Sequence, residues 1–192
     1  MSVRIVGIGG SVDAGSQSDA ALRAVLAGAE QRGATVQAFT GSSIDFPPYF
    51  TGVQIPAAAG DYIDAVRAAD AVVISSPGYH GTISGLVKNA LDYLEELRAE
   101  NRPYLDGRAV GLVAVAAGWQ ATVNTLATLR QIAHTLRGWP TPYGLALNTT
   151  VTRFAADLST DVDTSRSVDL MAAQLADFAS KMGTSAAPGQ QP

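Results

Sequence analysis

The sequence predicts an α/β fold in which a parallel sheet is covered by helices on both faces. Short apolar runs alternate with segments of helical periodicity, which is the pattern of repeated βα units. The strand-like runs are mostly continuous in apolar residues, as strands buried on both faces require. With 192 residues, 47% of them hydrophobic, the chain has room for one substantial core. We therefore expect a three-layer α/β/α sandwich in which residues 1–183 form a single domain.

Five apolar runs fit the strands of this sheet. They cover residues 3–9, 35–39, 71–75, 109–116 and 141–146. Five parallel strands fit the order 2-1-3-4-5, and sheets of this kind bind ligands at the carboxyl ends of the strands where the order reverses. We therefore expect the site where the loops after the first and third strands face each other.

The intervening segments show helical periodicity. The first helix is expected at residues 18–31, with Ser18 as its N-cap and Gly33 beyond its end. The later helices have apolar faces made of Leu86, Ala90, Leu91 and Leu94, of Leu126, Leu129, Ile132, Ala133 and Leu136, and of Val168, Met171, Leu175, Phe178, Ala179 and Met182.

Two long segments, residues 40–56 and 148–164, lack a regular pattern, and loops of this length are usually functional or interfacial. The small, polar residues 184–192 are predicted to form a disordered tail.

Composition excludes several classes of function. The net charge is −4 and the 13 Lys and Arg are scattered, so no basic stripe is available for nucleic acid. The absence of cysteine excludes disulfides and thiolate chemistry, and two histidines, His80 and His134, are too few for a His-rich metal site. No apolar run approaches the roughly 18–20 residues that span a bilayer, and no signal-peptide pattern precedes the first strand. We expect a cytoplasmic protein that does not enter membranes.

The loop at residues 9–18 combines glycines with the hydroxyls of Ser11, Ser16 and Ser18 at the start of a helix. Backbone N–H groups and the helix dipole make such a loop an anion site, and its length fits a terminal phosphate better than a pyrophosphate. A Walker A motif would need Lys and Ser/Thr where Ser16 and Gln17 stand, and the dinucleotide fingerprint would need Gly where Val12 stands. Both of these classes are disfavoured.

Two other classes also fail on residue type. Between Gly81 and Gly85, Ser84 has one residue too many before it for the Gly-x-Ser-x-Gly elbow of a hydrolase. A response regulator would need clustered acids after the first and third strands, where Gly10 and Ser76 stand instead.

The loop after the third strand offers backbone groups, Tyr79 and His80 to a ligand, without a bulky charged side chain at its head. This suits a flat aromatic ring system with hydrogen-bonding edges. The pattern resembles the NADPH-dependent FMN reductase family, flavodoxin-like flavoproteins with Pro-x-Tyr, then Ser-Gly, then a helix opening with Leu, Lys and Asn. The matching residues are Pro77, Tyr79, Ser84, Gly85, Leu86, Lys88 and Asn89. The resemblance extends from the first strand to about Asn148 and implies a flavodoxin-like fold.

The resemblance also implies how FMN is held. The phosphate would lie in the first loop and the ring against the loops after the third and fourth strands. The implied FMN-binding residues are Ser11, Ser16, Gln17, Ser18, Pro77, Gly78, Tyr79, His80, Gly81, Ala117 and Gly118. No catalytic side chain is expected, because hydride passes from nicotinamide to flavin N5 and the protein supplies orientation. Tyr79 and His80 also have purely structural interpretations, as a packing residue and a loop hydrogen-bonding residue, and His134 is interpreted as structural.

Two residues depart from the family pattern. Asp13 stands where arginine is common, and its carboxylate would repel a phosphate, so we expect either weaker FMN affinity or an Asp13 side chain that points outward. Trp119 stands where glycine is commonest, and stacking on the flavin, shielding it and contacting another subunit all remain open.

By resemblance we expect an NAD(P)H-dependent FMN reductase that uses free flavin and NADPH or NADH, and supplies reduced FMN to a monooxygenase. The alternatives are a quinone, azo or chromate reductase with tightly bound FMN, and a non-enzymatic electron carrier of the flavodoxin kind. We also expect a homodimer or homotetramer, since relatives assemble in this way and the loop at residues 46–50 carries aromatic side chains that would be exposed.

Overall fold

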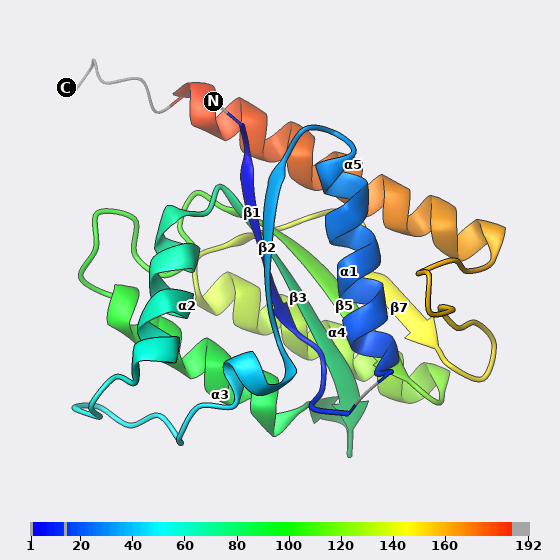
Figure 1. Ribbon diagram of the computed structural model, residues 1–192, viewed down its shortest axis with the longest axis horizontal. Helices are drawn as coiled ribbons and strands as arrows, with labels where there is room; N and C mark the ends of the chain where they lie inside the picture. Colours follow the sequence, from blue (N-terminus) through cyan, green and yellow to red (C-terminus); the bar gives the residue numbers. More distant parts are fainter. Residues whose placement is uncertain (1, 14, 186–192) are drawn as a thin grey trace.

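A computed structural model describes residues 2–13 and 15–185, and it confirms the predicted flavodoxin-like α/β/α sandwich (Figure 1). Its strands are β1 (Arg4–Gly9), β2 (Thr35–Thr40), β3 (Ala71–Tyr79), β4 (Thr82–Ile83), β5 (Ala109–Ala116), β6 (Trp139–Pro140) and β7 (Leu145–Asn148). Its helices are α1 (Gln17–Glu30), α2 (Ala57–Ala68), α3 (Gly85–Asp92), α4 (Trp119–Thr135) and α5 (Val162–Ser185), with short 3₁₀ helices η1 (Gly41–Ile44) and η2 (Tyr93–Leu97).

The sheet follows the predicted order with one difference at its edge. Strands run β2-β1-β3-β5, and both β6 and β7 then pair in parallel with β5. The predicted fifth strand at residues 141–146 is therefore wrong in its bounds, because the strand is split into two short segments around Pro142, which has no N–H to donate to a ladder. A two-residue strand, β4, also pairs antiparallel with the end of β3.

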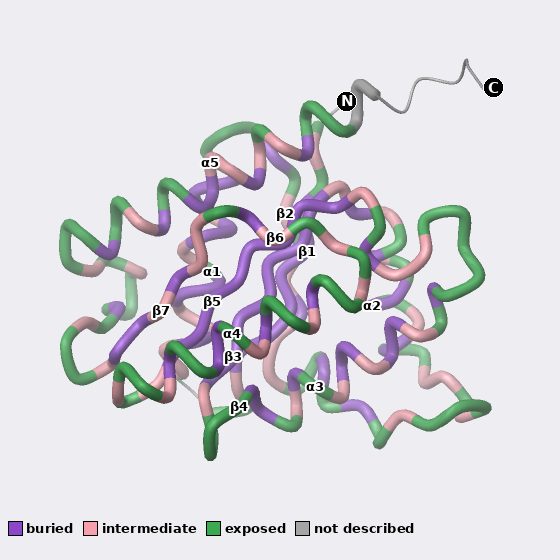
Figure 2. Tube along the Cα trace, turned by 180° about the vertical axis from the view of Figure 1, so that it is seen from behind, coloured by how far each residue is buried: buried purple, intermediate pink, exposed green. Residues whose placement is uncertain are grey.

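The helices form two layers, and each layer packs on its own half of the core. Helices α1 and α5 cover one face of the sheet through Leu22, Val25 and Leu175. Helices α2, α3 and α4 cover the other face through Ile63, Leu91 and Leu129. Figure 2 shows the central strands buried and the outer helix surfaces exposed. This double coverage explains why the strands read as continuous apolar runs.

The end of β1 lies directly against β3, and this contact requires a glycine. A Cβ at Gly9 would lie 1.8 Å from the carbonyl oxygen of Ser75, and the φ of Gly9 is +141°. The next residue, Gly10, donates its N–H to the same carbonyl at 3.1 Å. The chain can therefore leave β1 pressed against its neighbour and turn at once into the loop before α1.

Some predicted details differ in the structure. Helix α1 begins one residue early, because Ser16 is its N-cap, whereas the sequence analysis named Ser18. Ser18 is buried instead, and its carbonyl accepts a hydrogen bond from the Ser75 hydroxyl at 2.8 Å. Helix α5 continues through Thr184 and Ser185, and the rest of the predicted tail, residues 186–192, lies outside the described residues.

The loop at residues 46–50 exposes fewer aromatic side chains than expected. Phe46 is buried and its ring packs against Tyr62 and Tyr93, whereas Phe50 is 63% exposed. The expectation of an exposed aromatic surface is therefore wrong for Phe46.

Candidate functional site

The loop after β3 is a tight hairpin rather than an open loop. Tyr79 pairs with Thr82 across a two-residue turn in which His80 and Gly81 both have positive φ values, 50° and 92°. Two positive φ values are characteristic of the type I′ hairpin turn. The turn places His80 at an exposed tip and leaves Tyr79 about half exposed at its base.

Helix α4 supports this hairpin from behind. A Cβ at Gly78 would lie 2.5 Å from Thr125 Oγ1 and 3.3 Å from Ala121 O, so only glycine lets the strand and helix approach this closely. Ser76 lies below the hairpin, and its hydroxyl accepts a hydrogen bond from the backbone N–H of Ser84, the N-cap of α3. These contacts connect the hairpin to the starts of two helices.

The first loop ends at the α1 N-terminus with a pair of hydroxyls. Ser16 Oγ caps the helix by accepting from Asp19 N, and it lies 2.8 Å from Ser18 Oγ. Ser11 Oγ is used within the loop, where it accepts from Asp13 N and donates to the Asp13 carboxylate, both at 3.2 Å. The loop thus presents hydroxyls and a helix N-terminus, which suit an anion, together with the exposed acid Asp13, which does not.

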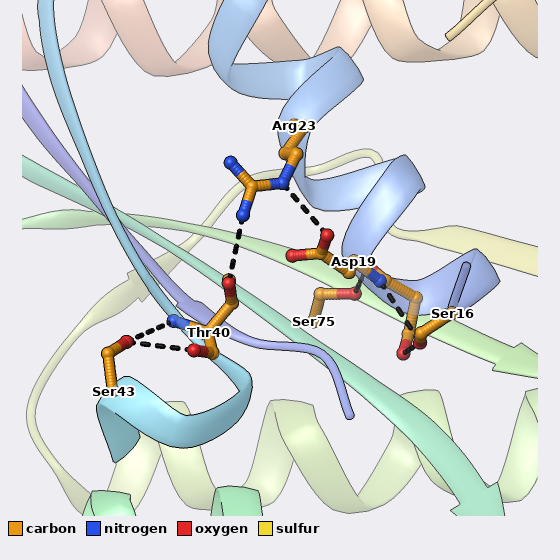
Figure 3. Close-up of polar contacts among 7 residues, drawn as sticks. Ser16, Asp19, Arg23, Thr40, Ser43 and Ser75 are labelled. Carbon is orange, nitrogen blue, oxygen red and sulfur yellow. Dashed lines mark hydrogen bonds and ion pairs between the residues drawn. The ribbon is translucent and has the colours of Figure 1, made fainter. Parts of the chain in front are cut away.

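Near these hydroxyls, Arg23 connects α1 to the end of β2 (Figure 3). Arg23 donates to Asp19 Oδ2 at 2.8 Å and to Thr40 Oγ1 at 3.0 Å. Ser43 in turn bonds both the N–H and the carbonyl of Thr40, each at 2.8 Å. This chain of contacts ties the first turn of α1 to η1, and η1 leads into the loop at residues 45–50.

The side chain of Gln17 fastens the loop after β7 to the start of α1. Its Oε1 accepts from the backbone N–H of Phe154 at 2.7 Å, and its Nε2 donates to the carbonyl of Phe154 at 3.2 Å. The residues are 137 positions apart in the chain. A reciprocal amide pair of this kind fixes the loop in both position and orientation.

These loops enclose a cleft of about 480 Å³ at the carboxyl end of the sheet. Eight of the eleven predicted site residues line it: Ser11, Ser16, Gln17, Ser18, Pro77, Gly78, Tyr79 and Ala117. His80 and Gly81 lie beyond it in the hairpin turn, and Gly118 is the N-cap residue of α4. The structure therefore brings most of the predicted set to one place, where β1 and β3 end.

A second hollow of about 620 Å³ adjoins the first, since Ser11, Asp13, Pro77 and Tyr79 line both. Its other wall comes from the loop at residues 45–48 and the first turns of α3, with Asp45, Phe46, Pro48, Ser84, Gly85, Leu86 and Asn89. Both volumes fall within the few hundred to about a thousand Å³ common for ligand sites. Because they share four lining residues, the two hollows form one continuous depression at the carboxyl end of the sheet.

Asn89 holds the outer wall of this second hollow in place. Its Oδ1 accepts from Tyr49 N at 2.9 Å, and its Nδ2 donates to the carbonyls of Phe46 and Pro47 at 3.0 and 3.1 Å. Tyr49 adds a hydrogen bond from its hydroxyl to Glu96, and partial burial together with that bond raises the pKa of Tyr49 to about 12. Asn89 thus has a definite structural role in the wall.

Sequence reasoning missed several lining residues. Thr149 and Arg153 line the first cleft, and Asp45, Phe46 and Pro48 line the second. The two long aperiodic segments that contain them were a signal for function, but nothing in their pattern singled out these positions.

Among the described residues, no cluster of three or more His, Cys, Asp or Glu is suited to a metal ion. Within the described ranges, no helix is long and apolar enough to cross a membrane.

Comparison with known proteins gives consistent matches. The family model of the NADPH-dependent FMN reductases matches residues 3–152. An NAD(P)H-dependent FMN reductase of Pseudomonas aeruginosa, PA1204, is 30% identical over 132 residues, which cover 67% of this chain and 68% of that protein. An FMN-dependent NADPH-azoreductase of Staphylococcus haemolyticus is 36% identical over 86 residues, 45% of this chain and 42% of that protein. The match thus spans less than half the length of this azoreductase.

Solved structures share the fold. FerB, an NAD(P)H:acceptor oxidoreductase from Paracoccus denitrificans, has a TM-score of 0.75 at 19% identity, over 94% of this chain and 98% of that one. The apo form of the NADH:FMN oxidoreductase EmoB has a TM-score of 0.71 at 20% identity, over 94% and 90%. Because the family model covers most of the chain, this protein belongs to the NADPH-dependent FMN reductase family of oxidoreductases.

Proposed function

We propose that this protein binds FMN in the first cleft and reduces it with NADPH or NADH bound in the adjoining hollow. The observation that carries the proposal is the meeting of a hydroxyl-lined helix N-terminus and the Pro77–Tyr79 wall at one end of the sheet, in a protein of this family. FMN supplies an N5 position that accepts a hydride from the reduced nicotinamide.

The donor set of the first cleft fits FMN at both ends. Ser16, whose hydroxyl is hydrogen-bonded to that of the buried Ser18, stands at the start of α1, where the helix dipole favours a phosphate. Gly78, which has no side chain, and Ala117, which has only a methyl group, lie on the opposite side, where a flat ring needs close approach. The two ends are joined by Tyr79, whose half-exposed ring is available to the flavin or to the nicotinamide.

The second hollow suits the nicotinamide. It shares Pro77 and Tyr79 with the first cleft, so a ligand there would lie beside the flavin rather than apart from it. Its walls combine the apolar Phe46, Pro48 and Leu86 with a few polar groups, as ligand pockets usually do. We infer that the loop held by Asn89 closes the outer side of this space and keeps water from the hydride.

The test is anaerobic oxidation of NADPH by the purified protein, with and without added FMN, following nicotinamide and flavin absorbance together. Turnover that requires free FMN and bleaches it stoichiometrically supports the proposal that flavin is a diffusing substrate. Rapid turnover with flavin that stays bound through purification identifies tightly held FMN. Bound flavin with no nicotinamide oxidation would overturn the reductase proposal in favour of an electron carrier.

A second candidate function is reduction of an azo dye or quinone by protein-bound FMN. It is favoured by relatives of this chain that are FMN-dependent NADPH-azoreductases. Adding methyl red to the same anaerobic assay separates the two functions. An azoreductase bleaches the dye with enzyme-bound flavin alone, whereas a flavin reductase does so only when free FMN carries the electrons.

The wider biological setting is also a proposal. We propose a single-domain cytoplasmic protein that assembles as a homodimer or homotetramer and passes reduced FMN to a monooxygenase. Light scattering tests the assembly, and a monomeric mass would contradict it. Coupled assays with a flavin-dependent monooxygenase test the transfer, and product formation no faster than with chemically reduced FMN would contradict a dedicated partner.

A further inference from the structure

The first cleft has an unusual charge distribution for a phosphate site. Its lining includes one acid, Asp13, and no Lys or Arg from the first loop, which has none between residues 9 and 18. The single Lys or Arg among the lining residues is Arg153, which comes from the loop after β7. The cation and the hydroxyls therefore come from opposite ends of the chain.

The backbone of Arg153 is held on both sides. Its carbonyl accepts a hydrogen bond from Thr160 Oγ1 at 3.1 Å. The following residue, Phe154, is buried and has both of its backbone groups bonded to the Gln17 amide at 2.7 and 3.2 Å. Gln17 stands between Ser16 and Ser18 in sequence. Its two hydrogen bonds to Phe154 therefore hold the neighbouring Arg153 at the cleft that these serines also line. Figure 1 shows the segment after β7 running beside the start of α1.

Neighbouring contacts stiffen the same loop. The Thr152 hydroxyl donates to the carboxylate of Asp161, which also accepts from Thr164 N at 2.9 Å and so caps α5. These hydrogen bonds, that of Thr152 first, hold the pKa of Asp161 well below its usual range. The residue before Arg153 is thus fixed to α5, as the residue after it is fixed to α1.

The Arg153 side chain itself is free to serve a ligand. It is exposed, and none of the carboxylates in the described ranges forms an ion pair with it, although Asp13 lines the same cleft. A guanidinium with a fixed backbone and an uncommitted head is well suited to a phosphate, which it can bind through two parallel N–H groups. The cleft offers no other cation for this purpose among its described lining residues.

We propose that Arg153 binds the phosphate of FMN and offsets the repulsion from Asp13. The inference rests on the proposed function, since it assumes that FMN occupies the first cleft. It assigns phosphate recognition partly to the loop after β7, one residue beyond the end of the family match at residue 152. Gln17 is then a positioning residue, because its amide holds the loop that carries the guanidinium.

The experiment compares FMN with riboflavin, which has the same ring and no phosphate. Binding is measured by quenching of flavin fluorescence, a readout independent of turnover. Arg153→Ala should weaken FMN binding about tenfold, as expected for a partly exposed charge-assisted contact, and leave riboflavin binding unchanged. Arg153→Lys should recover part of the loss. Asp13→Asn should strengthen FMN binding by several-fold and leave riboflavin binding unchanged.

Arg166→Ala is the matched control. Arg166 is an exposed residue of α5 that does not line the cleft, and its Nη1 lies 3.6 Å from Asp163 Oδ1. The substitution removes the same charge as Arg153→Ala. Equal weakening of both flavins by Arg153→Ala would show that the residue only supports the loop, and no change in either would show that it does not reach the phosphate. Either result overturns the inference while the proposed function stands. Wild-type protein that binds neither flavin would overturn the proposed function itself.

Discussion

Replacing Ser16 with aspartate tests the phosphate site without removing a helix cap. Ser16 Oγ accepts from Asp19 N at the start of α1. Asp and Asn are N-cap residues about as good as serine, so Ser16→Asp and Ser16→Asn should both fold with α1 intact. The two variants are nearly isosteric and differ in one negative charge, so a difference between them in ligand binding reports electrostatics.

The size of the effect follows from the position of Ser16. Ser16 Oγ lies at the N-terminus of α1, so an anion bound at that N-terminus would lie on the order of 4 Å from a carboxylate at position 16. Two unit charges at that distance repel by about 1 kcal/mol in water and about 4 kcal/mol at an effective dielectric of 20. The half-buried site lies between these limits. We expect about 2 kcal/mol, or roughly a thirtyfold weaker Kd.

The assay is fluorescence titration of both variants with FMN and with riboflavin at low salt. Ser16→Asp should bind FMN roughly thirtyfold more weakly than Ser16→Asn, and the gap should narrow as salt is added. Riboflavin should bind both variants equally. Identical FMN curves for the two variants would refute the assignment of the first loop to phosphate.

Three further predictions concern the frame around the site. Tyr62→Phe should raise the free energy of unfolding by about 1 kcal/mol, since the Tyr62 hydroxyl is fully buried with no hydrogen-bond partner among the described residues; urea denaturation measures this. Asn89→Ala should lower the free energy of unfolding by about 2 kcal/mol and speed proteolysis at residues 45–50, because three hydrogen bonds to that loop are lost. In Asp161→Asn the melting temperature, followed by circular dichroism, should fall less steeply with decreasing pH than it does in the wild-type protein. The folded-state pKa of Asp161 lies below its unfolded value, so its stabilisation is complete above about pH 4 and is lost as the pH falls towards the folded pKa.

Each of these predictions has an internal control. Destabilisation by Tyr62→Phe would show that the hydroxyl is satisfied, for instance by a buried water molecule. Lys88→Ala removes an exposed neighbour of Asn89 on α3, and equal effects of the two variants would argue against the wall-holding role. A wild-type melting temperature that falls no faster than that of Asp161→Asn between pH 5 and pH 3 would contradict the role given to the Asp161 carboxylate.

The fold was predictable because alternation of strand and helix patterns needs only local information. The errors came where tertiary contacts decided between local options. Both Ser16 and Ser18 are good cap residues by type, and in the structure Ser16 caps α1 while Ser18 is buried with its carbonyl bonded to the Ser75 hydroxyl. The fifth strand was different, since Pro142 already indicated a break that the apolar pattern concealed.

The site was predictable to the extent that its residues follow strands in sequence. Pro77 and Tyr79 lie at the end of β3, and Ser16 follows the loop after β1, so the topology of the sheet places them at the same edge. Arg153 could not be placed in this way, because its position depends on a pairing between Gln17 and Phe154 across 137 residues. The two-residue turn at His80 and Gly81 could not be predicted either. The dipeptide His-Gly is not one of the usual hairpin signals, Asn-Gly and Asp-Gly, and the turn is defined by the pairing of Tyr79 with Thr82.

The contact between Gly9 and the Ser75 carbonyl has a consequence for how this site can change. Backbone contacts, and not side chains, fix where the loop leaves the sheet. The position of β1 and β3 beneath the first cleft therefore does not depend on which residues follow Gly10. Acidic, basic or hydroxyl side chains in the loop after Gly10 can therefore be exchanged for one another while β1 and β3 stay in register. Under the proposed function, substitutions at positions 13 and 153 would change FMN retention without disturbing this frame, whereas position 9 admits only glycine.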